Sequence, residues 1–213
     1  VVTIAGWVHQ VRDLGKIAFL MLRDRSGVVQ CVLEGDMYTK LAQVNLESVI
    51  AVTGRVVIAS TASAVEIQIQ QAEVIVPVTA SLPFEIYKKD LEVRLDTLLD
   101  HRLLALKNLR TRAIFKGQAQ ILHYMREYFA MLDFTEMNTP KLIGYPTEGG
   151  AEVFEVKYYE RSAYLAQSPQ FYKQMMVSVF ERVYEIAHAY RAEKSNTSRH
   201  MAELVMIDAE LGF

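Results

Sequence analysis

The sequence has little from which a disulfide, a broadly basic surface or a membrane span could be built. Its 213 residues include one cysteine, Cys31, and carry a formal net charge of −2. Because a lone cysteine cannot form an internal disulfide, Cys31 in the apolar run VVQCVL is predicted to be a buried thiol in a reducing compartment. The near-neutral charge excludes a generally basic nucleic-acid binder, so a polyanion could be bound only by a local patch.

Long apolar runs, clustered histidines and a phosphate loop are also missing. No apolar run approaches the length of about 18 residues that a membrane span needs, and no signal peptide is seen, so no membrane partner and a cytoplasmic location are expected. The five histidines are scattered, which predicts no metal site. No glycine-rich loop leads into Lys-Ser or Lys-Thr, so ATP would have to bind through arginines.

The first third of the chain has the pattern of a small β barrel. Apolar runs between residues 1 and 77 are separated by turn residues, which predicts five strands, with the helical stretch DMYTKLAQV between the third and the fourth. This is the element order of an OB-fold barrel, whose exposed face commonly binds oligonucleotides. A barrel with no ligand stays the alternative, because a fold does not imply a function.

The rest of the chain predicts a linker and an α+β domain. Residues 78–106, around PVTASLPFEI, are predicted to be a linker or hinge, and residues 107–213 a second domain. A long amphipathic helix over NLRTRAIFKGQAQILHYMREYFAMLD leads into the short strand FTEMNTP, which Pro140 ends. The apolar stripe of this helix is interpreted as core or as a subunit interface. Long strands at RVYEIAHAYRAE and MAELVMIDAELGF complete the α+β pattern.

A highly charged loop lies between those two long strands. Strand periodicity puts Arg191 and Glu193 on the same side of the first strand. The planar guanidinium of Arg191 can clamp a carboxylate or a phosphate with two hydrogen bonds, and Arg199 and His200 supply donors suited to the outer phosphates of a nucleotide. The alternative is a solvated hairpin tip whose charges satisfy one another.

A second candidate site is the helix start in YLAQSPQFYKQ. Ser168 can cap the helix and Pro169 suits its first position, so the free N–H groups there favour an anion. Gln167, Gln170 and Lys173 lie beside this start and could hold a small amino acid by its charged ends. The same motif is also simply a good helix start.

A third candidate is the stretch PTEGGAEVF. Its two glycines permit close approach of a ligand, and Glu148 before them could accept a hydrogen bond from an ammonium group. A flexible loop with one acidic residue is the alternative.

Together these motifs resemble a class II aminoacyl-tRNA synthetase, specifically aspartyl-tRNA synthetase of the archaeal and eukaryotic type. GWVHQVRDLGKIAFLMLRDRSGVVQ is similar to the anticodon-binding barrel, FTEMNTPKL to motif 1 and YRAEKSNTSRHMAEL to motif 2. PTEGGAEVF and YLAQSPQFYKQ are similar to the loops that enclose the amino acid. Motif 3 is not found and both ends of the sequence lie inside strand-like runs, so a fragment is expected, with an incomplete catalytic domain and an incomplete ATP site.

The resemblance implies that aspartate attacks the α-phosphate of ATP and that aspartyl-adenylate then charges tRNA-Asp, with the protein orienting the reactants and stabilising charge. Arg191 is the implied catalytic residue, and Lys173 is implied to pair with the side-chain carboxylate of aspartate. Mg²⁺ is expected to be held by residues outside this chain. The implied ATP-binding residues are Arg191, Ala192, Glu193, Arg199, His200 and Met201. The implied aspartate-binding residues are Glu148, Gln167, Ser168, Pro169, Gln170, Lys173 and Arg191.

The resemblance also implies contacts with tRNA and with a second subunit. The implied tRNA-binding residues are His9, Arg12, Phe19, Gln30 and Ala62, and Pro140 is implied to lie at a homodimer interface. Phe19 would stack on an anticodon base. His9 and Ala62 replace a tryptophan and a lysine that are typical of members restricted to tRNA-Asp, which predicts that tRNA-Asn is charged as well.

Some residues depart from the family pattern, and two other functions stay open. Leu204 replaces a phenylalanine that stacks on adenine in many members, and AHAY replaces the more usual Gly-Pro-Val-Phe before Arg191. One alternative is an asparaginyl-tRNA synthetase of the same fold, although TEGGAEVF favours aspartate. The other is a non-catalytic relic that binds tRNA or dimerises.

Overall fold

The computed structural model describes residues 1–58, 65–148, 152–194, 197 and 200–213. These residues form two compact units, Val1–Phe115 and Lys116–Phe213. Within the described part of the chain, no helix is both long and apolar enough to cross a membrane. Ala62 and Arg199, two of the predicted site residues, lie outside the described residues.

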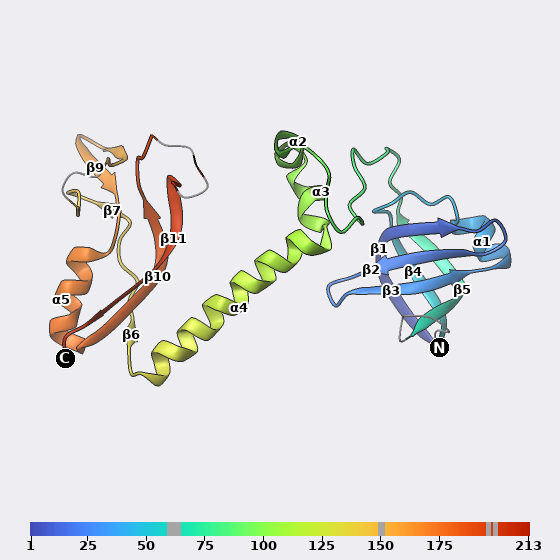
Figure 1. Cartoon of the computed structure of the whole chain (residues 1–213), viewed down its shortest axis with the longest axis horizontal. Helices are drawn as coiled ribbons and strands as arrows, with labels where there is room; N and C mark the ends of the chain where they lie inside the picture. Colours follow the sequence, from blue (N-terminus) through green and yellow to red (C-terminus); the bar gives the residue numbers. More distant parts are fainter. Residues whose placement is uncertain (59–64, 149–151, 195–196, 198–199) are drawn as a thin grey trace. The chain divides into compact units, whose positions relative to one another are not determined.

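A closed five-stranded barrel makes up most of the first unit (Figure 1). The strands follow one another around the barrel in the order β1-β2-β3-β5-β4, and the helix α1 lies between β3 and β4 in the sequence. The predicted OB-fold is therefore confirmed. The elements are β1 (Val2–Asp13), β2 (Ala18–Arg23), β3 (Val28–Leu33), α1 (Gly35–Leu41), β4 (Val49–Val57) and β5 (Glu66–Val76).

The barrel interior is filled by aliphatic side chains from alternate strand positions, as a half-buried strand requires. Cys31 is fully buried among them, and burial raises the pKa of its thiol to about 12. A Cβ at Gly6 would collide with the carbonyl of Arg23, and one at Gly54 with that of Gln68, so these close strand contacts require glycine. The core residues are Val8, Ala18, Leu20, Leu22, Cys31, Leu33, Leu41, Ile50, Val52 and Ile67.

The segment predicted as a linker contains two short helices, α2 (Leu95–Asp100) and α3 (Arg102–Lys107), and the long helix α4 (Leu109–Met131) follows. Asn108 fixes the start of α4: its side-chain amide donates to the carbonyls of Ile86 and Lys88 at 2.9 and 2.7 Å, and its Oδ1 accepts two N–H groups of the first turn. The domain boundaries at 77/78 and 106/107 stay predictions.

The second unit contains two small sheets, one in the order β11-β10-β6 and the other in the order β7-β9-β8. Helix α5 contacts β10 and β11 (Figure 1). The mixture of helices and mainly antiparallel strands confirms the predicted α+β class. The elements are β6 (Thr135–Glu136), β7 (Leu142–Ile143), β8 (Glu155–Tyr158), β9 (Arg161–Leu165), α5 (Gln170–Phe180), β10 (Arg182–Tyr190) and β11 (Glu203–Leu211).

The hairpin of β10 and β11 carries the charged loop at one end. Its register pairs Arg182 with Leu211 at one end and Tyr190 with Glu203 at the other. The prediction that the first strand extends to residue 193 is wrong, because β10 ends at Tyr190. Arg191 still donates its N–H to the Ala202 carbonyl at 3.0 Å, but the next N–H turns away and bonds to Glu152.

Candidate functional site

Three segments of the second unit meet at the carbonyl of Glu152. The N–H of Ala192 donates to it at 3.0 Å, and the side-chain amide of Gln167 reaches it at 3.5 Å. The N–H of Tyr190 donates to the Ala166 carbonyl at 2.9 Å. The structure therefore brings the predicted motif 2 arginine and the predicted QSPQ motif together, beside Glu152.

Three buried polar atoms of the second unit have no hydrogen-bond partner among the described residues: Nε of Arg191, Oε1 of Gln167 and, in the stretch before Glu148, Oγ1 of Thr147. A buried polar atom without a partner costs about 1 to 3 kcal/mol, and native proteins contain few of them. The guanidinium N–H is a donor, the amide oxygen is an acceptor and the hydroxyl can do either, a combination suited to a polar, charged ligand.

Lys173 lies in α5 with its side chain 13% exposed, and it pairs with two acidic residues of β11. Its ammonium is 2.8 Å from Oδ1 of Asp208 and 3.1 Å from Oε2 of Glu210. Burial acts to lower the pKa of Lys173, but the hydrogen bonds to the two carboxylates outweigh it and the pKa is raised. The sequence interpretation missed Asp208 and Glu210, although their spacing of two in a strand places them on one face.

Among the other predicted aspartate-binding residues, Ser168 and Pro169 are buried, while Glu148 and Gln170 are half-buried. The hydroxyl of Ser168 accepts the N–H of Gln170 at 3.3 Å, but Ser168 lies one position before the N-cap residue, so the prediction that it caps the helix is wrong. Pro169, predicted as the first helical residue, is the N-cap residue of α5, so the helix begins one residue later than predicted, at Gln170.

His200, the one predicted outer-phosphate residue that lies in the described part of the chain, is exposed. Nε2 of His200 lies 3.9 Å from Oε2 of Glu193, and its Nδ1 lies 2.8 Å from the hydroxyl of Thr197. Met201 is 57% exposed. Here the loop places a histidine and a carboxylate side chain close together near the solvent.

Strand register brings the predicted RNA-reading residues of the barrel onto its outer face. Arg12 lies opposite Phe19 on neighbouring strands, and Gln30 lies opposite Met21, two positions further along the strand that carries Phe19. Gln30 donates to Glu66 at 3.0 Å. A half-buried aromatic ring beside an exposed arginine is a suitable platform for a stacked base.

His9 does not share that exposed position. It is 5% exposed, and its Nδ1 is 3.0 Å from Nη1 of Arg23. Neighbouring side chains therefore cover the ring of His9, unlike those of Arg12 and Phe19, and its role in tRNA binding stays a prediction. Burial, and then the neighbouring charge of Arg23, lower the pKa of His9.

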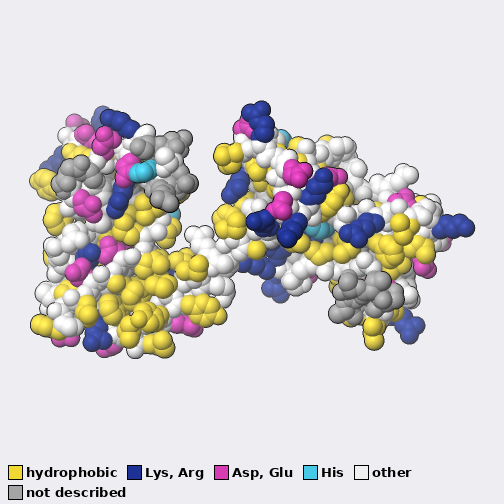
Figure 2. Space-filling model, in the orientation of Figure 1, with side chains coloured by type: hydrophobic (Ala, Val, Ile, Leu, Met, Phe, Trp, Pro, Cys, Tyr) yellow, Lys and Arg dark blue, Asp and Glu magenta, His cyan; other side chains and the backbone are white. Residues whose placement is uncertain are grey.

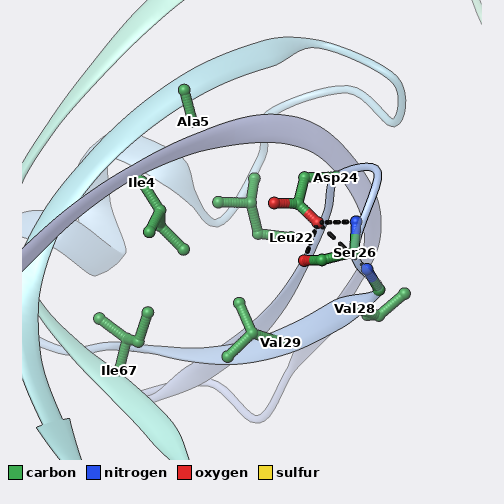
Figure 3. Close-up of a pocket in the computed structure, with 9 residues that line it drawn as sticks. Ile4, Ala5, Leu22, Asp24, Ser26, Val28, Val29 and Ile67 are labelled. Atoms are coloured by element: carbon green, nitrogen blue, oxygen red, sulfur yellow. Dashed lines mark hydrogen bonds between the residues drawn. The ribbon is translucent and has the colours of Figure 1, made fainter.

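The barrel also contains a hollow of about 360 Å³, shown in Figure 3. Aliphatic side chains such as Ile4, Leu22 and Ile67 line it, and the carboxylate of Asp24 accepts hydrogen bonds from Ser26 at its rim. None of the predicted tRNA-binding residues within the described part of the chain lines this hollow. The hollow lies at the edge of the barrel core, and its lining residues differ from those of the predicted RNA-reading face.

Metal ligation has no support among the described residues, which contain no group of three or more histidine, cysteine, aspartate or glutamate side chains placed to hold an ion. Pro140, the implied interface residue, is exposed.

An OB-fold barrel followed by an α+β unit of small sheets and helices is the architecture of a class II aminoacyl-tRNA synthetase. Residues 94–213, more than half of the chain, match the family model for tRNA synthetases class II (D, K and N), and residues 2–75 match that for OB-fold nucleic acid binding domains. The chain belongs to the class II tRNA synthetases of the D, K and N type.

Its relatives include aspartate–tRNA ligases. The chain is 43% identical to an aspartate–tRNA(Asp/Asn) ligase of Archaeoglobus fulgidus and 46% identical to one of Thermus thermophilus, in both cases over 100% of the chain. These matches cover 51% and 49% of the two relatives, so the chain spans about half the length of the curated relatives it matches.

Solved structures of both amino-acid specificities share the fold. The asparaginyl-tRNA synthetase of Pyrococcus horikoshii with asparaginyl-adenylate matches with a TM-score of 0.89 and 32% identity, covering 99% of this chain and 49% of that one. The aspartyl-tRNA synthetase of Entamoeba histolytica matches with a TM-score of 0.79 and 29% identity, covering 99% and 47%.

Proposed function

We propose that the complete gene product is an aspartate–tRNA ligase, which activates L-aspartate with ATP and transfers it to tRNA-Asp. The observation that carries this proposal is the pair of unsatisfied polar atoms on Arg191 and Gln167, held together around Glu152. Curated relatives with aspartate–tRNA ligase names support it along the whole chain.

In this mechanism Arg191 binds the charge that develops when the aspartate carboxylate attacks the α-phosphate. A buried donor fixed before the reaction can stabilise the transition state without reorganising. Glu193 and His200 lie at the exposed end of the loop, where they would contact the nucleotide together with Arg199, Ala192 and Met201. Mg²⁺ would neutralise the phosphates, and we place its ligands outside these 213 residues.

The cation of Lys173 favours aspartate over asparagine, because a carboxylate side chain gains an ion pair that an amide cannot make. Asparagine is the second candidate, since the asparaginyl-tRNA synthetase of Pyrococcus horikoshii is a close structural match. In the proposed site, the incoming carboxylate competes with Asp208 and Glu210 for the ammonium of Lys173.

We further propose that the barrel binds the anticodon through Arg12, Phe19 and Gln30, and that tRNA-Asn is charged as well as tRNA-Asp. Several relatives carry the name aspartate–tRNA(Asp/Asn) ligase, whereas one from Pyrococcus horikoshii is named an aspartate–tRNA(Asp) ligase. The buried position of His9 makes an effect on tRNA choice indirect, through the shape of the neighbouring surface.

We propose that the enzyme is a cytoplasmic homodimer with Pro140 at the interface. Hydrophobic side chains gather over the lower part of the second unit in Figure 2. In the second half of α4, Ile121, Tyr124, Tyr128 and Met131 are each at least half exposed. An apolar patch of this kind marks an interaction surface.

The test is ATP–pyrophosphate exchange by the complete gene product with L-aspartate or L-asparagine, followed by charging of both tRNA transcripts. We expect exchange with aspartate only and charging of both tRNAs. Exchange with asparagine alone would establish the second candidate, and no exchange with either would support a non-catalytic relic. The 213-residue chain assayed in parallel is expected to be inactive.

A further inference from the structure

A buried glutamate in the middle of β10 holds the segment after β6. Glu185 is 2% exposed, and its Oε1 accepts the N–H of Thr139 at 2.7 Å. Its Oε2 accepts the hydroxyl of Thr139 and the ammonium of Lys141, both at 2.8 Å. A buried carboxylate with this many charge-assisted donors is fixed in a single orientation.

The segment held by Glu185 is tied to both loops of the proposed site. The carbonyl of Lys141 accepts the N–H of Ala166, and the carbonyl of Ala166 accepts the N–H of Tyr190, each at 2.9 Å. Gln167 and Arg191 are the next residues in the sequence after these two bonded positions. Backbone hydrogen bonds therefore connect the proposed site to the cluster of Glu185, Thr139 and Lys141.

A small hollow separates this cluster from the Lys173 pair. Lys141, Glu185, His188 and Asp208 lie on its walls, and its volume is about 10 Å³, which is room for about one water molecule. A water there could accept a hydrogen bond from Lys141 and donate to the carboxylates of Glu185 and Asp208. Three such bonds are typical of a buried water.

We infer that Glu185 is a positioning residue for aspartate recognition, which fixes Asp208, and through it the ammonium of Lys173, across a hollow sized for one water molecule. The inference rests on the proposed function. Without a bridging hydrogen-bond donor the two carboxylates would repel each other across the hollow, and Asp208 would no longer hold Lys173 at one place.

The first test is Glu185→Gln in the complete gene product, with the KM values for aspartate and ATP and the kcat measured by ATP–pyrophosphate exchange. Loss of one charge-assisted hydrogen bond predicts a rise of about tenfold in the aspartate KM, with the ATP KM and the kcat nearly unchanged. Thr139→Val, which keeps the carboxylate and removes a neutral donor, should raise the aspartate KM by about fivefold.

Glu160→Gln is the matched control, because this exposed residue lies in the turn between β8 and β9 and undergoes the same chemical change. It should leave all three constants unchanged. A purely structural role for Glu185 would instead lower the kcat in proportion to the folded fraction, with both KM values unchanged, and that result would overturn the inference. If Glu185→Gln does not fold, Thr139→Val decides in the same way.

A double-mutant cycle of Glu185→Gln with Asp208→Asn tests the path across the hollow. If the two residues are coupled, the increase in aspartate KM of the double variant should be smaller than the product of the increases of the two single variants. A crystal structure gives a readout that needs no substrate: a water bonded to both carboxylates supports the inference, and a dry hollow overturns it. Wild-type protein that activates no aspartate would sink the proposed function, whereas the crystal result would still decide the role of Glu185.

Discussion

Two buried arginine groups, Arg23 in the barrel unit and Nε of Arg191 in the second unit, differ in their partners. In the barrel unit, Arg23 and Glu47 are both nearly inaccessible, and Nη2 of Arg23 lies 2.8 and 2.9 Å from the two carboxylate oxygens of Glu47. Oε1 makes no hydrogen bond of good geometry, but this ion pair balances its charge. Lys107 adds a second cation at 2.6 Å from Oε2. In the second unit, the buried Nε of Arg191 has no such partner among the described residues.

This difference separates a group that holds the fold from a group that we propose binds a ligand. A buried ion pair with both partners present fixes the geometry of the chain around it. Glu47 has a positive φ of 67°, which a non-glycine residue rarely adopts, and its carboxylate is held by a strand and a helix distant in the sequence. A buried donor that the protein leaves unsatisfied gains its hydrogen bond only when a ligand arrives.

The largest effect on stability is expected from breaking the buried ion-pair cluster of Arg23, Glu47 and Lys107. Glu47→Gln leaves Arg23 buried without a counter-ion, which should lower the free energy of unfolding of the barrel unit by about 3 to 5 kcal/mol. Trp7 is the only tryptophan in the sequence, and its ring lies 5.8 Å from Arg23 and 5.9 Å from Lys107, so urea unfolding followed by its fluorescence measures the loss.

Glu34→Gln is the control, because Glu34 is the exposed N-cap residue of α1 and makes no side-chain capping bond. An unchanged unfolding midpoint for Glu47→Gln would show that the barrel does not depend on this cluster.

A substitution of Arg191 should have the opposite effect: a loss of activity without a loss of stability. Arg191→Gln removes a donor from the transition state, which should slow ATP–pyrophosphate exchange by about 10² to 10³-fold, while the unfolding midpoint stays the same or rises. Arg161→Gln, at an exposed arginine of β9, should change neither quantity. A loss of stability equal to that of Glu47→Gln would mean that Arg191 is a structural residue, and the comparison would fail.

Much of the fold could be predicted because it follows from periodicity. The five barrel strands, the helix α1 and the β10–β11 hairpin all have a spacing of two or a helical spacing that is visible in the sequence. The strands β6 and β7 have two residues each, and β7 was missed because a run this short carries no period. The end of β10 at Tyr190 was misplaced because a tertiary bond, from Ala192 to the Glu152 carbonyl, ends the strand.

The candidate site was predictable only in part. Arg191, Gln167 and Lys173 were found from the chemistry of their motifs, and the resemblance supplied their roles. Two contacts could not be predicted from the neighbouring sequence. Lys173 pairs with Asp208 and Glu210, and the buried ring of His9 contacts Arg23. Both depend on which residues the folded chain brings together across 35 and 14 positions of sequence.

The exposed side of the barrel should give an intermediate effect. Phe19→Ala removes a ring on which a base can stack, and this should weaken tRNA binding by about 1 to 3 kcal/mol. Filter binding of the tRNA transcript at one fixed salt concentration measures it, since affinity for nucleic acid depends on salt. Ile75→Ala removes an exposed apolar side chain from another strand of the barrel and should leave the affinity unchanged. Equal losses for both variants would refute a specific stacking position.

The smallest effect is a pH dependence of the free energy of unfolding. The barrel cluster of His9, Arg23 and Glu47 should cause it, and Arg191 should not. Burial, and then Arg23, lower the pKa of His9 below its ordinary value of 6.5, whereas Glu47 acts to raise it. The unfolded chain therefore takes up the proton first as the pH falls. His9 contributes stability that is fully present above about pH 6.5 and is lost as the pH falls toward its folded pKa, with a slope of at most about 1.4 kcal/mol per pH unit for one proton.

His9→Gln should flatten that part of the urea-stability profile, measured by Trp7 fluorescence, and Arg191→Gln should leave it in place. A slope that survives His9→Gln would assign the titration to another group and remove His9 from the cluster that stabilises the barrel.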